Sequence, residues 1–193
     1  TKILFGAGRE SEVGKQVAAF GGHKVMIIYG KKGGHIETSG LLDRVHKSLS
    51  DAGLSYVDLN GVVPNPRLSL VKEGIRIGRA EGVDFLLPIG GGSVIDTAKG
   101  IGYGIANDFE MEDLLYGRVK TDKNLPIGVI LTIAAAGSEM SSSMVLTIED
   151  GMMKRSYGHD CSRPKFAIMN PELTYSLPAY QTASGAADIM MHT

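Results

Sequence analysis

A run of three glycines followed by a serine and an aspartate is the part of the chain best suited to hold a phosphate group. It lies in residues 88–102, "PIGGGSVIDTAKGIG", directly after the apolar run "VDFLL". Glycine lets a backbone approach a ligand closely, and a helix that begins here would direct unpaired N–H groups and the positive end of its dipole toward an anion. Ser93 as N-cap and Asp96 three residues later also have the spacing of a capping box. We interpret Gly91, Gly92, Ser93 and Asp96 as part of an anion site.

Known phosphate-binding motifs match neither this run nor the glycine-containing stretch near the start of the chain. The dinucleotide fingerprint G-x-G-x-x-G would need a glycine at Ile95, and the earlier stretch "GAGRES" has Ser11 where the third glycine belongs. A phosphate loop of the G-x-x-x-x-G-K-[ST] type fails as well, because Gln16 follows Gly14 and Lys15. The glycines could instead form a turn that only lets a helix pack closely on a strand.

Strand-like and helix-like segments alternate along the first half of the chain. This alternation is typical of βαβ units and predicts an α/β fold, a Rossmann-like open parallel sheet with flanking helices. We predict strands at 24–29, 54–59 and 83–89, and helices at 38–53 and 65–82, the first of these opened by Thr38 or Ser39. Ligands of such sheets bind at the carboxyl ends of the strands, which is where the glycine run falls.

The second half predicts further elements and a domain boundary. A short helix is expected at 108–117, strands at 126–133 and 164–170, and a hairpin around Asp150 and Gly151. From Pro178 onward a new helical pattern begins, and it is still under way where the sequence stops. We assign residues 1–177 to an α/β domain and residues 178–193 to the first helix of an all-helical second domain. We therefore expect the chain to be part of a longer polypeptide.

Composition and charge are those of a globular protein with a packed core. The net charge is −1 and the lysines and arginines are scattered, so the basic stripe of a nucleic-acid-binding surface is missing. No segment approaches the ~20 apolar residues of a membrane span. The single cysteine, Cys161, and the lack of a recognisable signal peptide predict a cytoplasmic location. The 26 glycines, about twice the usual share of ~7%, predict many turns or close backbone approaches.

Five segments in a fixed order resemble the iron-containing alcohol dehydrogenase family, and within it the butanol-dehydrogenase-like branch. They span almost the whole chain: "FGAGRESEVG" (5–14), "GGGSVIDTAKGI" (90–101), "LTIAAAGSEMS" (131–141), "RPKFAIMNPELTYSLP" (163–178) and "GAADIMMHT" (185–193). The resemblance implies a dehydroquinate synthase-like fold of two domains, an α/β nucleotide-binding domain followed by a helical domain that completes a metal site between them. Of the second domain, this sequence would hold only the opening helix.

The resemblance also implies a divalent metal held by one aspartate and three histidines, and Asp188 and His192 match the aspartate and the first histidine. Residues four apart lie on one helix face, so a carboxylate and an imidazole there can converge on one ion. Such donors suit iron or zinc, and the metal would act as a Lewis acid on the alcohol oxygen. By itself, an Asp–His pair at this spacing is usually a solvated helix face. The remaining histidines of the chain do not occupy the family's ligand positions: His23, His35, His46 and His159.

Gly30 bears on which nicotinamide cofactor is used. An acidic residue after the second strand normally binds the ribose 2′-hydroxyl of NAD, and NAD-preferring relatives carry an aspartate near this position. Gly30 leaves room for the 2′-phosphate of NADP, and Lys31 or Lys32 could pair with it. We therefore predict NADP rather than NAD, although both lysines could simply be solvated.

Further cofactor contacts follow from the resemblance alone. Thr132 and Ser138 are expected to border the pyrophosphate and the nicotinamide ribose, and Ser141 stands where close NADP-dependent relatives often have asparagine. Lys154 matches a lysine that reaches the cofactor, but it could be an exposed hairpin residue. Asn65 would belong to the adenine-side loop, although the sequence Pro-Asn-Pro around it is also a rigid entry to a helix.

These observations predict a metal-dependent, NAD(P)-linked alcohol dehydrogenase or aldehyde reductase. It would transfer a hydride between the nicotinamide and a small primary alcohol or aldehyde, and the complete enzyme would be a homodimer. The 193 residues alone are expected to be inactive, because two protein ligands rarely hold a metal. Two alternatives stay open: a nucleotide-binding module without catalysis, and a metal-independent reductase or lyase on the same fold.

Overall fold

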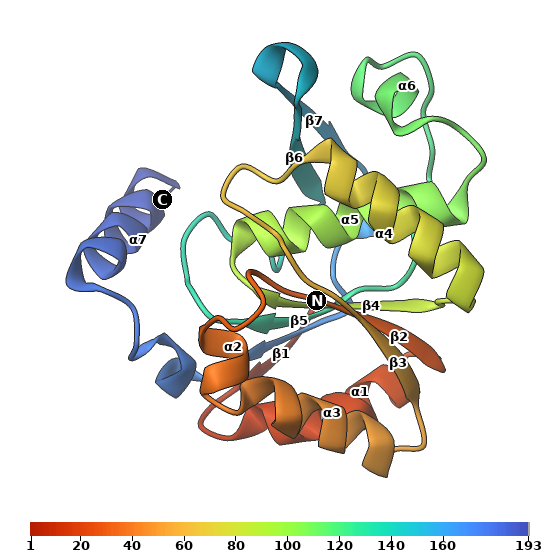
Figure 1. Ribbon diagram of the computed structural model, residues 1–193. Coiled ribbons are helices and arrows are strands. Elements are labelled where there is room, and N and C mark those ends of the chain that lie inside the picture. Colours follow the sequence, from red (N-terminus) through yellow and green to blue (C-terminus); the bar gives the residue numbers. More distant parts are fainter. Residues whose placement is uncertain (193) are drawn as a thin grey trace.

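The computed structural model describes residues 1–192 and contains one open six-stranded sheet (Figure 1). All neighbouring strands in it are parallel, in the order β1-β8-β5-β4-β2-β3. Its strands are β1 (Lys2–Phe5), β2 (Lys24–Ile28), β3 (Ser55–Leu59), β4 (Phe85–Gly90), β5 (Gly128–Leu131) and β8 (Phe166–Met169). The predicted Rossmann-like parallel sheet is therefore confirmed. β1 and β8, which are the first and last of its strands along the sequence, are neighbours in it.

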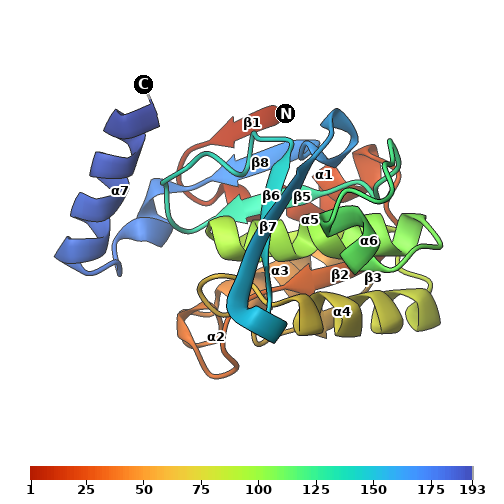
Figure 2. The same cartoon turned by 90° about the horizontal axis from the view of Figure 1, so that it is seen from above.

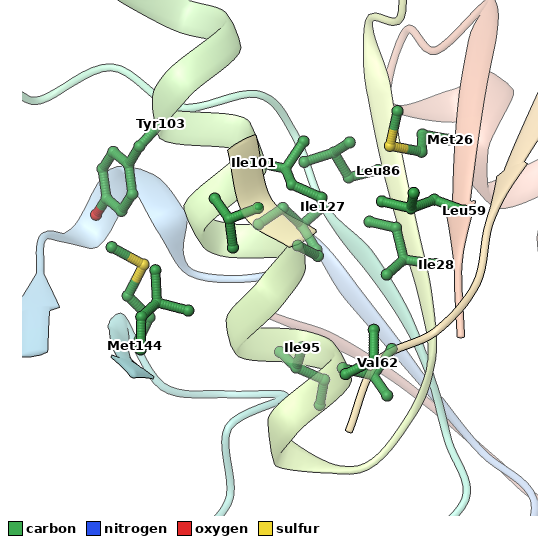
Figure 3. Close-up of a cluster of buried hydrophobic side chains, with 14 of the residues drawn as sticks. Met26, Ile28, Leu59, Val62, Leu86, Ile95, Ile101, Tyr103, Ile127 and Met144 are labelled. Carbon is green, nitrogen blue, oxygen red and sulfur yellow. The ribbon is translucent and has the colours of Figure 1, made fainter. Parts of the chain in front are cut away.

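Helices cover both faces of the sheet (Figures 1 and 2). One face carries α1 (Val13–Ala19) and α3 (Leu41–Asp51), and the other carries α4 (Leu68–Glu81) and α5 (Gly92–Ala106). The short α6 (Met111–Leu115) lies farther from the sheet and contacts α5 and β7. Each layer has its own apolar core. Figure 3 shows Ile101 of α5 beside Leu86 of β4, and Ile95, nearer the start of the helix, beside Val62. This packing fixes the start of α5 at the carboxyl edge of β4.

Glycines account for the close approach of α4 and α5. A Cβ atom built at Gly74 of α4 would lie 2.4 Å from the Cδ1 atom of Ile101, and one built at Gly104 of α5 would lie 2.1 Å from the Cδ1 atom of Ile75. An isoleucine of each helix thus packs directly against a glycine of the other helix. The high glycine content of the sequence reflects such packing as well as turns.

A two-stranded antiparallel ribbon lies over α5 and α4 (Figure 2). It consists of β6 (Ser143–Ile148) and β7 (Met153–Gly158), and Thr147 pairs with Lys154 across it. The turn between the strands is a 3-10 segment, η2 (Asp150–Met152). The predicted hairpin around Asp150 and Gly151 is confirmed.

The helix predicted over residues 38–53 is observed as α3 (Leu41–Asp51), which begins later than expected, and a separate short helix precedes it. Residues His35–Thr38 form α2, and α3 begins only at Leu41, after Gly40 in the left-handed region with φ 70°. Thr38 therefore ends one helix instead of capping the next, because glycine supplies a backbone turn that a Ser or Thr cap does not. Three further short 3-10 segments complete the described elements: η1 (Arg9–Glu12), η3 (Asp160–Ser162) and η4 (Pro171–Thr174).

Helix α7 (Ala179–His192) stands at one side of the molecule, beyond the carboxyl edge of the sheet (Figure 1). It agrees with the helical start predicted from Pro178. Its apolar side chains near the end are exposed: Ile189 by 44%, Met190 by 76% and Met191 by 85%. Among the described residues, no helix is both long and apolar enough to cross a membrane.

Candidate functional site

The glycine run lies between the end of β4 and the beginning of α5. β4 ends at Gly90, α5 begins at Gly92, and Gly91 between them is extended, with φ −102° and ψ −164°. The carbonyl of Gly91 accepts hydrogen bonds from the N–H groups of Val94 at 3.0 Å and Ile95 at 3.2 Å. Gly91 is thus the N-cap of α5. The N–H groups of the first helical residues have no acceptor within the helix and face the carboxyl edge of the sheet.

The predicted capping box is wrong. Ser93 lies inside the first turn, because the helix begins one residue before it, and no side chain caps this helix. Asp96 turns instead toward the loop between β5 and β6. Its Oδ1 atom accepts a hydrogen bond from the Ser138 hydroxyl at 2.7 Å, and its Oδ2 atom accepts one from the Val145 N–H at 3.0 Å. Burial raises the pKa of the Asp96 carboxyl, which these two hydrogen bonds oppose.

A pocket of about 320 Å³ opens beside the first turn of α5. It is lined by Asn65, Pro66, Gly92, Ser93, Asp96, Val145, Thr147 and Lys154. Five of these residues were predicted from the sequence as cofactor contacts, and they come from three separate segments: the loop before α4, the start of α5, and β7. The structure therefore brings together at one helix N-terminus residues that lie up to 89 positions apart in the sequence.

The three glycines of the run have different reasons to lack a side chain. A Cβ atom at Gly90 would lie 2.5 Å from the Cγ2 atom of Val94, and one at Gly91 would lie 2.3 Å from the Cγ2 atom of Ile133. Both glycines are therefore required by packing within the protein. A Cβ atom at Gly92 would meet nothing closer than the Ser138 Cβ atom, at 4.0 Å. Packing explains two of the glycines and leaves the one that lines the pocket unexplained.

The far wall of the pocket is the β6–β7 ribbon. Lys154 lies opposite Thr147 on this ribbon, and both line the pocket. The Thr147 N–H donates to the carbonyl of Pro66 at 2.8 Å, which ties the ribbon to the loop before α4. In that loop Asn65 has φ 58°, in the left-handed region that asparagine tolerates better than most residues. An exposed lysine and an asparagine are thus held beside the helix N-terminus.

Lys99 is a functional candidate that our sequence reasoning missed. Its side chain is fully buried, one turn after Asp96 on α5. Its Nζ atom donates hydrogen bonds to the Ser138 carbonyl at 2.9 Å, the Ser138 hydroxyl at 3.0 Å and the Ser143 carbonyl at 2.7 Å. Burial lowers the pKa of Lys99 to about 8, against the attraction of Asp96. The signal was available, because a lysine in so apolar a helix must be paired when it is buried.

The remaining predicted cofactor residues lie outside the pocket lining. Thr132 is bound through its N–H to the Gly90 carbonyl at 3.1 Å. The Ser141 hydroxyl accepts a hydrogen bond from the Ser143 N–H at 3.0 Å. Both belong to the segment between β5 and β6, which packs against the glycine run. Ser138 of the same segment uses its hydroxyl within the protein, as described above.

Gly30 follows β2 and has open space beside it. A Cβ atom built there would have only the Val62 carbonyl oxygen within 4 Å, at 3.8 Å. Lys31 and Lys32, which come next, are exposed. The arrangement leaves room for a charged group at Gly30, at the end of a strand next to β4 in the sheet.

Asp188 and His192 lie four residues apart on α7, as the spacing predicted. Gly185, one turn before Asp188, packs so closely on the loop after β5 that a Cβ atom there would lie 2.6 Å from the Ala134 carbonyl oxygen. The side chain of His192 falls outside the described part of the chain. Within that part there is no group of three or more His, Cys, Asp or Glu side chains that could hold a metal ion. The pair supplies two donors of suitable chemistry, a carboxylate oxygen and an imidazole nitrogen, which is fewer than metal sites usually have.

Two further pockets lie outside the lining of this site. One of about 300 Å³ is mostly apolar and lies at the ends of β1, β5 and β8, with Phe5, Leu131, Ala134 and Met169 among its lining residues. Ala134 also contacts α7, so this pocket adjoins the helix that carries Asp188. Another, of about 390 Å³, lies beside the end of α5 away from the glycines. Its cations are engaged by protein groups, for example Lys72 by Glu112.

Fold and site together define a Rossmann-like α/β protein with a helix N-terminus exposed at the carboxyl edge of a parallel sheet. The chain belongs to the iron-containing alcohol dehydrogenase family, which its sequence matches over residues 1–171. The predicted family is therefore confirmed.

Individual relatives support the butanol-dehydrogenase-like branch. The chain is 42% identical over 193 residues to the NADH-dependent butanol dehydrogenase A of Clostridium acetobutylicum, of which it covers 49%. It is 34% identical over 197 residues to the NADPH-dependent aldehyde reductase YqhD of Escherichia coli, again covering 49%. The crystal structure of an NADH-dependent butanol dehydrogenase A from Thermotoga maritima matches the whole chain with a TM-score of 0.95 and 37% identity, over 48% of its own length. The chain thus spans about half the length of the curated relatives it matches.

Proposed function

We propose that this chain binds a nicotinamide dinucleotide with the pyrophosphate at the N-terminus of α5. The observation that carries the proposal is the convergence of Asn65, Gly92, Ser93 and Lys154 on one pocket at that helix end. Unpaired N–H groups and the helix dipole favour an anion there, and a lysine on the opposite wall adds a positive charge. The open space at Gly92 supports the same proposal, because a phosphate could approach the backbone where no protein atom does.

We propose further that the protein to which this chain belongs transfers a hydride between that cofactor and a small primary alcohol or aldehyde. The activities for which these relatives are named, butanol dehydrogenase and aldehyde reductase, support this reaction class. A divalent metal such as iron or zinc, when bound, would supply Lewis-acid polarisation of the substrate oxygen. Asp188 and His192 would be two of its ligands. The apolar pocket beside Phe5 and Ala134 suits the hydrocarbon part of a small alcohol, and it adjoins α7.

Turnover separates this enzyme from a nucleotide-binding module without catalysis. Because the described residues supply no cluster of three metal donors, we expect the 193-residue chain to show very little or no oxidation of NADPH with butanal, even with added Fe(II) or Zn(II). The complete protein, assayed in parallel, should turn over with the metal and lose activity with a chelator. Metal-independent turnover by the complete protein would instead favour a reductase without a metal.

The choice between NADPH and NADH can be tested at Gly30. We propose that the missing carboxylate and the two following lysines admit the 2′-phosphate, so the chain should bind NADPH. The relatives do not fix this choice, since one is named an NADH-dependent enzyme and another an NADPH-dependent enzyme. A Cβ atom at this position meets no atom closer than 3.8 Å, and Gly30→Asp should weaken NADPH binding about tenfold or more while leaving NADH binding nearly unchanged.

Fluorescence titrations of both cofactors measure this preference, and Gly30→Asn is the matched uncharged control. Gly30→Asn should retain most of the NADPH affinity. Equal losses of NADPH and NADH in Gly30→Asp would show that the ribose 2′-position does not lie near Gly30.

A further inference from the structure

The segment between β5 and β6 is held to α5 by two side chains that lie one turn apart. Lys99 donates hydrogen bonds to both the carbonyl and the hydroxyl of Ser138 and to the carbonyl of Ser143. Asp96 accepts hydrogen bonds from the Ser138 hydroxyl and from the Val145 N–H. We call this set of contacts the Asp96–Lys99 clamp. Ser138 is its centre, because its hydroxyl joins the two charged side chains.

The clamped segment forms the boundary of the space above the glycine run. Its Ile133 side chain fills the volume that a Cβ atom would occupy at Gly91, and the Ser138 Cβ atom is the protein atom nearest to a Cβ atom at Gly92. A shift of this segment would therefore change the room available at the N-terminus of α5. Lys99 cannot reach a ligand in the pocket itself, since its side chain is fully buried.

We propose that Lys99 is a positioning residue that holds residues 132–142 against the first turn of α5 and thereby sets the shape of the nucleotide pocket. The inference rests on the proposed function, because it concerns the same pocket. It goes beyond it by assigning a role to a side chain that does not contact the cofactor. A misplacement of about 1 Å in such a wall can cost up to ~100-fold in function.

The charge of Lys99 gives the clamp a dependence on pH. The charged groups that face Lys99 are Asp96 and Glu139, which favour its ammonium form, and Arg163, which opposes it. Burial outweighs the attraction and lowers the pKa to about 8. Above that pH the amine has one donor fewer for its three acceptors. The clamp should therefore weaken, and nucleotide affinity should fall, as the pH rises through this pKa.

The test compares the chain with Lys99→Met, which keeps a long apolar side chain but donates no hydrogen bond. Lys47→Met is the control, since Lys47 is an exposed lysine on α3 that pairs with Asp51. Circular dichroism verifies folding, hydrogen exchange without nucleotide reports on residues 132–142, and NADPH titrations are made one unit below and one unit above the Lys99 pKa of about 8. If Lys99→Met does not fold, the Ser138→Ala variant is tested in its place. It removes the hydroxyl that joins Lys99 to Asp96.

For Lys99→Met we expect faster exchange in residues 132–142, a roughly 10- to 100-fold weaker NADPH affinity, and loss of the pH dependence that the unmodified chain and Lys47→Met show. If the unmodified chain binds NADPH and the variant matches it in loop exchange or in affinity, the inference is wrong and the proposed function stands. If the folded, unmodified chain binds neither NADPH nor NADH, the proposed function fails, and the inference fails with it.

Discussion

Ser93→Asp should reduce the affinity for NADPH and NADH by at least about 100-fold without harming the fold. The side chain at this position lines the pocket in the first turn of α5. A carboxylate near a bound phosphate, at ~4 Å and an effective dielectric constant of ~20, costs about 4 kcal/mol before salt screening. The same carboxylate is favourable for the helix itself, because it faces the positive end of the dipole. Fold and function should therefore respond in opposite directions.

The matched control for this experiment is Ser93→Asn, which has nearly the same shape without the charge. It should retain binding within about tenfold, and it should unfold near the temperature of the unmodified chain, whereas Ser93→Asp should unfold at or above that temperature. Fluorescence titration with each cofactor and thermal unfolding give the two quantities. If Ser93→Asp binds NADPH as tightly as Ser93→Asn does, the pyrophosphate does not lie at this helix end.

The adjacent glycines should separate a packing role from a ligand role. Gly91→Ala places a methyl group against Ile133, where only 2.3 Å is available, and such overpacking typically costs about 1–3 kcal/mol of unfolding free energy. Gly92→Ala meets no close protein atom, and alanine is the better helix former, so stability should stay the same or rise by up to about 1 kcal/mol. Gly92→Ala should nevertheless weaken NADPH binding about 10-fold or more, because the methyl group occupies the space proposed for the phosphate.

Denaturant unfolding and NADPH titration of both variants measure this contrast. The informative result is whether Gly92→Ala loses NADPH affinity while its free energy of unfolding is unchanged or higher. A stable Gly92→Ala variant with unchanged affinity would mean that all three glycines serve only to pack α5 against its neighbours. The sequence analysis left open that the glycines only let the helix pack closely on a strand. For Gly90 and Gly91 the close contacts with Val94 and Ile133 already support such a packing role.

Most of the fold could be predicted from the sequence because its elements are local and strongly patterned. The strand at 24–29 and the helix at 65–82 differ from β2 and α4 by only a few residues at their ends. The start of α3 was placed too early, because Thr38 and Ser39 are residue types that favour an N-cap. The N-cap is instead Gly40 with φ 70°, a conformation that the residue types alone do not reveal.

Some residues of the candidate site were predicted from the sequence, and the roles of others were not. Gly92, Ser93 and Lys154 line one pocket, as the family resemblance led us to expect: the first two follow β4 at the carboxyl edge of the sheet, and the β6–β7 ribbon supplies Lys154. The roles of Asp96 and Lys99 could not be foreseen, since their partners lie about 40 or more residues further along the chain, in a segment whose path depends on tertiary packing. Spacing along the sequence suggested a local cap for Asp96, and a distant hydrogen bond took its place.

An NMR titration of the 193-residue chain with NADPH, followed through its backbone amides, tests directly whether the N-terminus of α5 binds the cofactor. We predict saturable binding in which the amides of Gly92 and Ser93 shift most, together with that of Lys154 across the pocket. Saturable binding that leaves these amides in place and moves those around Phe5 and Met169 instead would contradict it. So would the absence of binding by a chain whose spectrum shows that it is folded.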